Sequence, residues 1–229
     1  QLAAPPSYRG LDDCMVDGVA PDGSPVEVFA ALPPRGIPEL LHSQIAAGGA
    51  VLELGCGAGR ITKGLLDLGH RVWAVDNAPE MLERVDRRAE RVEADIWALD
   101  LRMRFDAVVA GSYLVNQWAP LLFATCARHV APDGVVLVQR YAPAWARAAE
   151  AGSSTSGAVE ITIDPITCVD DRVRFTATYR IGERSWAQDL DASVLDDAAL
   201  DRIASYSALH FDGVFDELDE WVAFVPSGA

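Results

Sequence analysis

The stretch AVLELGCGAGRIT, residues 50–62, decides the fold of this chain. It begins with a short apolar run at residues 51–54, interrupted only by Glu53, and such a run predicts a strand buried on both faces. Glycines follow at positions 55, 57 and 59, and apolar residues then recur at helical spacing. A turn without side chains lets a ligand approach the backbone beside the free amide groups of a helix start. The stretch therefore predicts a ligand site at the carboxyl end of a strand, where open α/β sheets bind small molecules.

The composition limits the class of protein. The chain has 229 residues, half of them hydrophobic, which predicts one well-cored domain with a small appendage. Its 19 basic and 34 acidic residues give a net charge of −15, which argues against nucleic acid or an anionic membrane as a partner. We find neither a membrane-spanning apolar run nor a signal peptide, so we expect a soluble cytoplasmic protein, monomeric or homodimeric, with a small-molecule substrate.

The cysteines and histidines do not form a metal site in the sequence. The cysteines are far apart and form no C-x-x-C pair, and the four histidines are equally scattered. We therefore expect free thiols in a reducing compartment and no bound metal. The cysteines concerned are Cys14, Cys56, Cys126 and Cys168.

Strands and helices alternate on both sides of the glycine turn. Strands are predicted at residues 51–54, 71–75, 91–94, 105–110 and 135–139, and helices at residues 37–47, 60–68, 80–88 and 120–130. This alternation predicts an α/β fold with parallel strands and right-handed crossovers. Two final strands, near residues 208–215 and 221–225, predict a terminal hairpin after a helix at residues 196–206.

The alternation breaks after residue 151. Residues 152–157 have the composition of a Ser/Gly linker, and the β-rich runs after them predict a small antiparallel insertion of two or three strands. Residues 1–35 are rich in Pro, Gly and Asp and predict an irregular arm with a short helix at residues 8–14. Because Tyr8 and Phe29 are unusual in a floppy tail, we favour a lid over a site.

Acidic and small residues follow the strands next to the glycine turn. Asp76 ends the second predicted strand, where its carboxylate can accept hydrogen bonds from both hydroxyls of an adenosine ribose. Asp95 ends the third strand, and Gly111 follows the fourth. Helix capping is the structural alternative for both aspartates, as gap filling in the core is for Met81. The glycine spacing also differs from the dinucleotide fingerprint G-x-G-x-x-G.

At these residues the chain resembles the class I S-adenosylmethionine-dependent methyltransferases. Residues 51–59 look like the glycine motif of that family and residues 75–82, VDNAPEML, like its strand-two motif, while residues 93–96 and 105–109 resemble the next two. The resemblance covers residues 36–141 and returns over the terminal hairpin. The insertion after strand five is similar to that of small-molecule N- and O-methyltransferases, including sugar amine and glycine N-methyltransferases.

The resemblance implies a Rossmann-like, seven-stranded, mostly parallel sheet with a terminal antiparallel hairpin and a small antiparallel β insertion. It implies S-adenosylmethionine as the cofactor and S-adenosylhomocysteine as its product. The chain then divides into an N-terminal arm or lid (1–35), a cofactor-binding α/β core (36–151), an antiparallel insertion on the substrate side (152–192) and the C-terminal part of the core (193–229).

The same resemblance implies roles for the matching residues. The glycine turn and Cys56 would lie against the methionine part of the cofactor, with Glu53 and the Gly111 carbonyl near its ammonium group, while Asp76 would hold the ribose. The adenine would lie among Asn77, Met81, Asp95 and Ile96. Asn116 would face the sulfonium or the substrate, and Tyr8 would close the pocket. The full implied cofactor-binding set is Tyr8, Glu53, Gly55, Cys56, Gly57, Gly59, Asp76, Asn77, Met81, Asp95, Ile96, Gly111 and Asn116.

Methyl transfer from a sulfonium is an in-line displacement, so positioning supplies much of the rate and a base is needed only for a protonated nucleophile. No general base is evident in the sequence, and Tyr113, Tyr141 and Arg140 are the candidates for a catalytic role. Aromatic residues after strands four and five and in the insertion suit an apolar or cationic acceptor. The candidate substrate-pocket residues are Tyr113, Arg140, Tyr141, Trp145, Tyr179 and Trp186.

We therefore expect an S-adenosylmethionine-dependent methyltransferase that acts on a nitrogen, oxygen or carbon nucleophile of a small molecule, a secondary metabolite. Two alternatives stay open. An NAD(P)-dependent oxidoreductase shares the opening architecture, although the glycine spacing argues against it. A non-catalytic S-adenosylmethionine-binding protein is compatible with the missing base.

Overall fold

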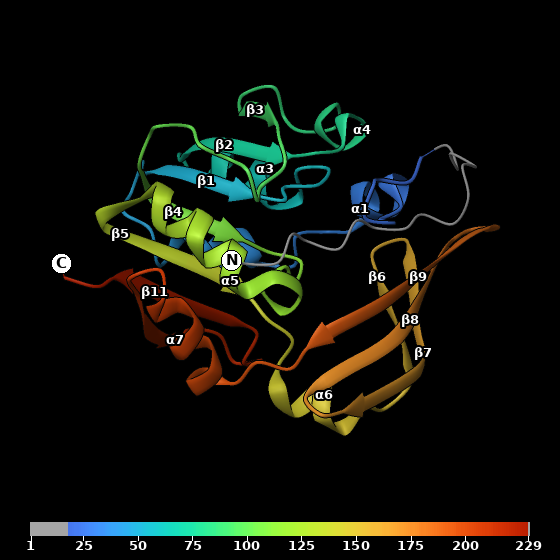
Figure 1. The fold of residues 1–229 in the computed structure, drawn as a ribbon. Helices are drawn as coiled ribbons and strands as arrows, with labels where there is room; N and C mark the ends of the chain where they lie inside the picture. The colour runs from blue at the N-terminus through green and yellow to red at the C-terminus, as the bar shows by residue number, and fades with distance from the viewer. Residues whose placement is uncertain (1–17, 229) are drawn as a thin grey trace.

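The computed structural model describes residues 18–228, which form two β-sheets and the helices that pack on them (Figure 1). The larger sheet has seven strands in the order β10-β11-β5-β4-β1-β2-β3. Its parallel part comprises β1 (Ala50–Leu54), β2 (Arg71–Asp76), β3 (Glu90–Glu93), β4 (Phe105–Ala110) and β5 (Val130–Gln139). The terminal hairpin of β10 (Leu209–Val214) and β11 (Trp221–Pro226) adds to β5 in antiparallel orientation. This confirms the expected mostly parallel sheet with its antiparallel hairpin.

Both faces of the larger sheet are buried, which explains why its central strand is so apolar. Leu52 and Leu54 point to the face that carries α5 (Val115–His129) and α7 (Asp197–Ser205). Val51 points to the opposite face, which carries α2 (Ile37–His42) and α3 (Arg60–Asp67). Alternate residues of one strand therefore belong to two separate hydrophobic clusters, as the pleat of a doubly covered sheet requires.

The second sheet is antiparallel and has four strands in the order β6-β7-β8-β9. These are β6 (Gly152–Ser156), β7 (Val159–Val169), β8 (Arg172–Ile181) and β9 (Arg184–Ser193), and α6 (Pro143–Ala148) precedes them. The prediction of a linker at residues 152–157 was wrong, because β6 pairs with β7 over its whole length. Its Gly/Ser composition carries no strand signal, and the hydrogen bonds of the β7 ladder decide its conformation.

Three helices differ from the prediction. Helix α4 (Pro79–Leu82) is much shorter than expected, since the next turns tighten to hydrogen bonds between residues three apart. Helix α5 begins earlier and has a non-helical residue at Trp118, two residues before Pro120. Proline lacks the amide hydrogen and crowds the preceding turn, which accounts for this kink. The predicted helix at residues 8–14 lies outside the described residues and stays a prediction, whereas α1 (Val26–Ala31) of the arm was not predicted.

The segment at residues 18–35 lies against both parts of the molecule. Helix α1 contacts α4, the helix between β2 and β3 of the larger sheet, and it also contacts β8 of the smaller sheet (Figure 1). Among the described residues, no helix has the length and apolar character needed to cross a membrane.

Candidate functional site

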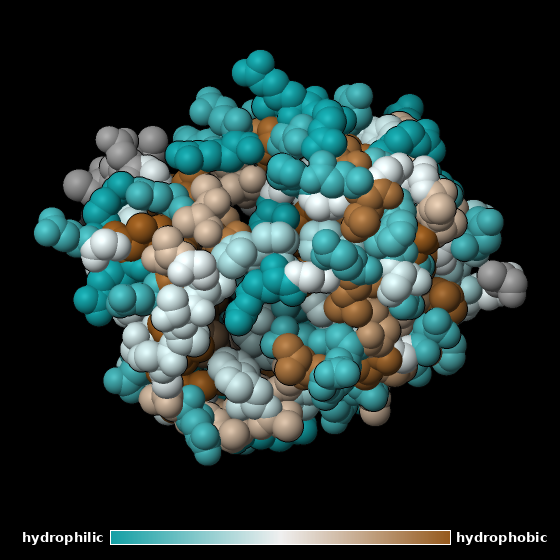
Figure 2. Space-filling view, turned by 180° about the vertical axis from the view of Figure 1, so that it is seen from behind, coloured by the Kyte–Doolittle hydropathy of each residue, from teal (hydrophilic) through white to brown (hydrophobic). Residues whose placement is uncertain are grey.

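A cavity of about 1440 Å³ opens where the two sheets and the segment at residues 18–35 meet. It lies at the carboxyl ends of β1, β2, β4 and β5, the edge at which the strand order reverses between β1 and β4. Figure 2 shows the molecule from behind, with a hollow bordered by both polar and apolar side chains near the middle of that face. The cavity is therefore open to solvent and mixed in character.

The strand registers bring the polar strand ends of the sheet into one row. Leu54 lies opposite Val75 of β2 and Ala110 of β4, so the residues that follow these strands are neighbours in space. Asp76 is the last residue of β2, and Gly55 and Gly111 follow β1 and β4. All three line the cavity.

The glycine turn needs its glycines for conformation and for space. Gly55, Gly57 and Gly59 have φ values of +66°, +53° and +81°, a region that side chains disfavour. A Cβ on Gly55 would lie 2.7 Å from Leu114 Cδ1. The Gly57 N–H donates to Asp76 Oδ2 at 2.8 Å, and the Ala78 N–H donates to Asp76 Oδ1 at 3.0 Å. Each carboxylate oxygen keeps lone pairs for a further donor, and burial raises the pKa of Asp76.

Glu53 is a buried carboxylate at the floor of the cavity. Its side chain lies on β1 and is only 2% exposed, and its Oε2 accepts a hydrogen bond from Thr62 Oγ1 at 2.6 Å. Burial raises its pKa to about 7, against the lowering effects of Thr62 and of the nearby Arg60. A carboxylate held in this state gains from the arrival of a cation such as an ammonium group.

Most residues of the implied cofactor-binding set line this one cavity. They are Glu53, Gly55, Cys56, Gly57, Asp76, Asn77, Met81, Asp95, Ile96 and Gly111. Asp95 also accepts a hydrogen bond from the Trp97 N–H at 2.9 Å, which caps a turn and not a helix. Their contacts with a ligand stay a prediction.

Two members of that set lie outside the cavity lining, and a third is not among the described residues. Gly59 precedes α3 and packs against Val85, outside the cavity lining, because only its neighbours in the turn face the ligand side. Asn116 is 1% exposed and bridges two segments: its Nδ2 donates to the Ser193 carbonyl at 2.9 Å, and its Oδ1 accepts from the Tyr141 N–H at 2.9 Å. Both the oxygen and the nitrogen of its side-chain amide form hydrogen bonds in this bridge, and the side chain does not line the cavity. Tyr8 lies outside the described residues.

Four of the six predicted substrate-pocket residues form an aromatic wall of the cavity. They are Tyr113, Tyr141, Trp145 and Tyr179. The rings of Tyr113 and Tyr141 stack with centroids 4.1 Å apart and planes 11° apart, and Trp145 continues the stack at 5.4 Å. Burial raises the pKa values of the tyrosines, that of Tyr179 to about 12, so these hydroxyls stay protonated at neutral pH.

The other two predicted pocket residues do not line the cavity. Arg140 is buried and forms ion pairs with Asp197, at 2.7 Å, and with Asp219. Because its neighbour Gln139 at the end of β5 points into the cavity, strand alternation sends Arg140 to the opposite side, where it ties the start of α7 to the loop before β11. Trp186 lies opposite Tyr179 in the ladder, but its ring stacks under the Arg184 guanidinium at 4.9 Å.

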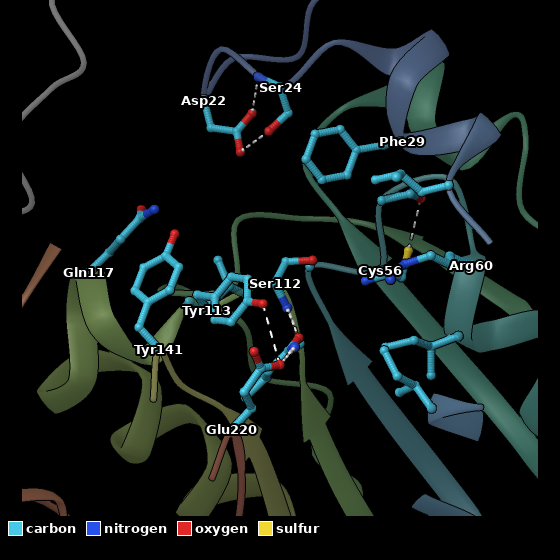
Figure 3. Close-up of a pocket in the computed structure, with 18 of the residues that line it drawn as sticks. Asp22, Ser24, Phe29, Cys56, Arg60, Ser112, Tyr113, Gln117, Tyr141 and Glu220 are labelled. Carbon is cyan, nitrogen blue, oxygen red and sulfur yellow. Dashed lines mark hydrogen bonds between the residues drawn. The ribbon is translucent and has the colours of Figure 1, made fainter. Parts of the chain in front are cut away.

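Sequence reasoning missed a hydrogen-bonded cluster in the cavity (Figure 3). Glu220, which precedes β11, accepts hydrogen bonds at Oε2 from Gln139 Nε2 at 3.0 Å and from the Tyr113 hydroxyl at 3.4 Å. Gln139 Oε1 in turn accepts from the Ser112 N–H at 3.0 Å. Burial raises the pKa of Glu220. Only the pairing of β11 with β5, which brings Glu220 beside Gln139, would have indicated this cluster.

The cavity-lining residues fit S-adenosylmethionine. Its ribose requires paired acceptors, its ammonium group requires an anionic or carbonyl partner, and its methionine part requires a close backbone. Asp76, Glu53 and the glycine turn supply these in one row. The side chain of Arg60 lies beside Cys56 in Figure 3. Its guanidinium is a cation of the kind that binds a carboxylate such as that of the methionine part of S-adenosylmethionine.

Comparison with known proteins agrees with this geometry. Residues 51–134 match the model of a family described as "Methyltransferase domain". A ubiquinone biosynthesis O-methyltransferase from Xanthomonas oryzae pv. oryzae is 34% identical over 100 residues, which cover 38% of this chain and 41% of that protein. The chain thus matches less than half the length of this curated relative.

Solved structures extend the likeness beyond the matched segment. An S-adenosylmethionine-dependent methyltransferase from Clostridium acetobutylicum superposes with a TM-score of 0.70 at 16% identity, covering 88% of this chain and 95% of the other. A sugar N-methyltransferase from Streptoalloteichus sp. gives a TM-score of 0.65 at 15% identity, with coverages of 86% and 88%. At such identities the likeness establishes the fold, including the second sheet. Residues 51–134 thus match a methyltransferase domain, and the chain as a whole has the fold of S-adenosylmethionine-dependent methyltransferases.

Proposed function

We propose that this protein is a methyltransferase that transfers a methyl group from S-adenosylmethionine to a small molecule. The observation that carries the proposal is one cavity with two chemically different halves. One half is lined by the glycine turn and the polar strand ends, and the other by stacked aromatic rings. Small-molecule sites usually have about 300–1000 Å³. The cavity of about 1440 Å³ has room for a cofactor and an acceptor together.

In this proposal the chain contributes binding and orientation. Asp76 holds the ribose, Glu53 and the Gly111 carbonyl hold the ammonium group, and the Gly57 backbone lies against the methionine part. When bound, S-adenosylmethionine supplies an electrophilic methyl group on a sulfonium, which leaves as S-adenosylhomocysteine. The aromatic wall holds the acceptor in line with that methyl group and excludes water, and such positioning is a major source of rate in displacement reactions.

The acceptor class rests on the lining of the second half and on the relatives. Aromatic walls suit a ring-containing or cationic small molecule. The names of an O-methyltransferase of ubiquinone biosynthesis and of a sugar N-methyltransferase agree with acceptors of this size. We infer a small secondary metabolite as the acceptor.

We further propose that the segment at residues 18–35 covers the acceptor half. Asp22, Ser24 and Phe29 line the cavity from this segment (Figure 3). Gln188 of β9 donates to the Asp22 carbonyl at 3.5 Å, and the Phe29 ring lies 6.3 Å from that of Tyr179. Helix α1 anchors this segment through the Glu27–Arg184 ion pair and the buried Val28, so the loop before α1, held by long hydrogen bonds, is the part that opens for substrate entry.

Two measurements test the proposal. S-adenosylhomocysteine should raise the melting temperature of the protein, whereas NAD⁺ and NADH should not; the reverse result would support the oxidoreductase alternative. With S-adenosylmethionine labelled in its methyl group, label should appear in at least one member of a panel of amines, phenols and carboxylic acids. Cofactor binding without transfer to any of them would favour the non-catalytic alternative.

A further inference from the structure

Glu220 is a carboxylate of the cavity that the cofactor does not need. It lies in the loop before β11, next to Gln139 at the end of β5, and faces the aromatic half of the cavity (Figure 3). The cofactor half already has its own carboxylates in Glu53 and Asp76. Glu220 is therefore available to a second ligand.

The backbone around Glu220 is held on both sides. Its carbonyl accepts from the Arg140 N–H at 2.7 Å, while Asp216 Oδ1 accepts from the N–H groups of Glu220 and Trp221 at 3.0 and 2.8 Å. Arg140 also forms an ion pair with the preceding residue, Asp219. A side chain on so well fixed a backbone has a defined position, as a binding residue requires.

The hydrogen bonds of the Glu220 side chain leave one oxygen free. Gln139 and Tyr113 both donate to Oε2, and no donor among residues 18–228 reaches Oε1. The turn that presents Tyr113 is strained, because Ser112 and Tyr113 have φ values of +54° and +60° without being glycine. Strain of this kind is kept in proteins where a side chain must be held at a functional site.

The surroundings of Oε1 are those that recognise an amine. The stacked rings of Tyr113 and Tyr141 lie beside the carboxylate, and ring faces attract cations. A partly buried carboxylate with a free oxygen forms its strongest hydrogen bond with a charged N–H donor. A hydroxyl acceptor would gain much less from the same oxygen.

We propose that Glu220 is the acceptor-binding residue of this protein and that the acceptor carries a primary or secondary amine bound at Glu220 Oε1. This inference rests on the proposed methyltransferase function and specifies its substrate class. Burial already raises the pKa of Glu220, which makes its carboxylate a better proton acceptor than an exposed one.

The chemistry balances with Glu220 as the proton acceptor. An amine reaches the site mostly as an ammonium ion, which has no lone pair. Glu220 Oε1 takes one proton and becomes a carboxylic acid, and the nitrogen regains its lone pair. As the bond between this nitrogen and the methyl carbon forms, the bond between the methyl carbon and the sulfonium sulfur breaks. The methylated nitrogen then carries the positive charge, neutral S-adenosylhomocysteine leaves, and the proton on Glu220 passes to water.

The test compares amines with alcohols of the same shape. Benzylamine against benzyl alcohol, and glucosamine against glucose, are titrated into the protein saturated with S-adenosylhomocysteine, and binding is measured by calorimetry. At least one amine should bind about tenfold more tightly than its alcohol, in line with a charge-assisted hydrogen bond. In Glu220→Gln this preference should fall to within about twofold, while the affinity for S-adenosylhomocysteine changes by less than about twofold.

Glu150→Gln is the matched control, since Glu150 is exposed, does not line the cavity and loses the same charge on replacement. It should keep the amine preference. If both variants lost the amine preference equally, the proposal would be overturned, because the preference would then come from the overall negative charge of the protein and not from a contact with Glu220. Equal or absent binding of amine and alcohol to the unmodified protein would also overturn it, and that arm needs no variant to fold. Failure to bind S-adenosylhomocysteine at all would instead remove the proposed methyltransferase function.

Discussion

The two halves of the cavity are built in different ways. The cofactor half comes mainly from one continuous stretch, residues 51–96, and much of it is backbone or a carboxylate bonded to backbone. The acceptor half is assembled from side chains of six separated segments, near residues 22–35, 113, 139–145, 154–163, 175–190 and 215–220. A ligand common to a whole family can be recognised by a local motif, whereas the ligand that distinguishes its members is recognised by parts that only tertiary structure joins.

The halves also differ in how their polar groups are supported. Asp76 and Glu53 have short hydrogen bonds of 2.6–3.0 Å within the core. The segment that covers the acceptor half is held to β9 by hydrogen bonds of 3.4–3.5 Å from Gln188 and by the partly exposed Glu27–Arg184 ion pair. We therefore expect variants of the cofactor half to change stability and cofactor affinity strongly, and variants of the cover to change mainly its mobility.

The largest effect should come from the titration of Glu53. Its pKa in the folded protein, about 7, lies above its ordinary value of 4.5, so folding favours the protonated form. This contribution is complete below about pH 4.5 and is lost as the pH rises through 7. At about 1.4 kcal/mol for each pH unit, the loss amounts to about 3 kcal/mol. Chemical unfolding at several pH values should show it in the ligand-free protein, and Glu53→Gln should lack it.

The same carboxylate should link cofactor binding to pH. An ammonium group binds the ionised form of Glu53, which is about one tenth of the population at pH 6. The affinity for S-adenosylhomocysteine should therefore be about tenfold weaker at pH 6 than at pH 8. Equal affinities at the two pH values would mean that Glu53 does not contact the ligand's ammonium group.

Second to the loss of stability at Glu53 is the effect of Asp76→Ala, which should weaken binding of S-adenosylhomocysteine by about 30-fold, or about 2 kcal/mol, since it removes charge-assisted hydrogen bonds from a partly buried site. Calorimetry measures the effect, and the melting temperature reports the separate cost of freeing the Gly57 and Ala78 amides. Asp95→Ala is the control, because Asp95 lines the same cavity but is exposed. It should cost less than about fivefold, and a larger loss there than at Asp76 would reverse our assignment of the ribose ligand.

The smallest effect on stability should come from Gln188→Ala. Its hydrogen bonds are long, so we expect a loss below about 1 kcal/mol in unfolding free energy. Hydrogen exchange at residues 20–29 should nevertheless become faster, while that of the strands around the glycine turn stays unchanged. Gln44→Ala, whose side chain bonds only to its neighbour Ser43, should leave both regions as they are. Unchanged exchange in Gln188→Ala would mean that the cover is held by the Glu27–Arg184 ion pair and by apolar contacts without help from Gln188.

Sequence periodicity predicted the parallel strands well, because strands buried on both faces leave nearly continuous apolar runs. Asp76 was predicted to face the ligand because the carboxyl ends of parallel strands all lie at the same edge of the sheet, where ligands bind. Asn116 and Arg140 were misplaced for the opposite reason. Their side chains form hydrogen bonds and ion pairs with residues 193, 197 and 219. These partners are distant in the sequence, so no local pattern predicts them.

The amino-acid sequence by itself determined the fold class, the glycine turn and the edge of the sheet at which we propose that the cofactor binds. These depend on local conformation and on hydrophobic periodicity, which are properties of short stretches. Only the tertiary structure decided that β6 is a strand and that Glu220 lies beside Gln139 and Tyr113. Strand pairing and the convergence of distant side chains depend on contacts across the whole chain, and the acceptor half of the cavity consists of such contacts.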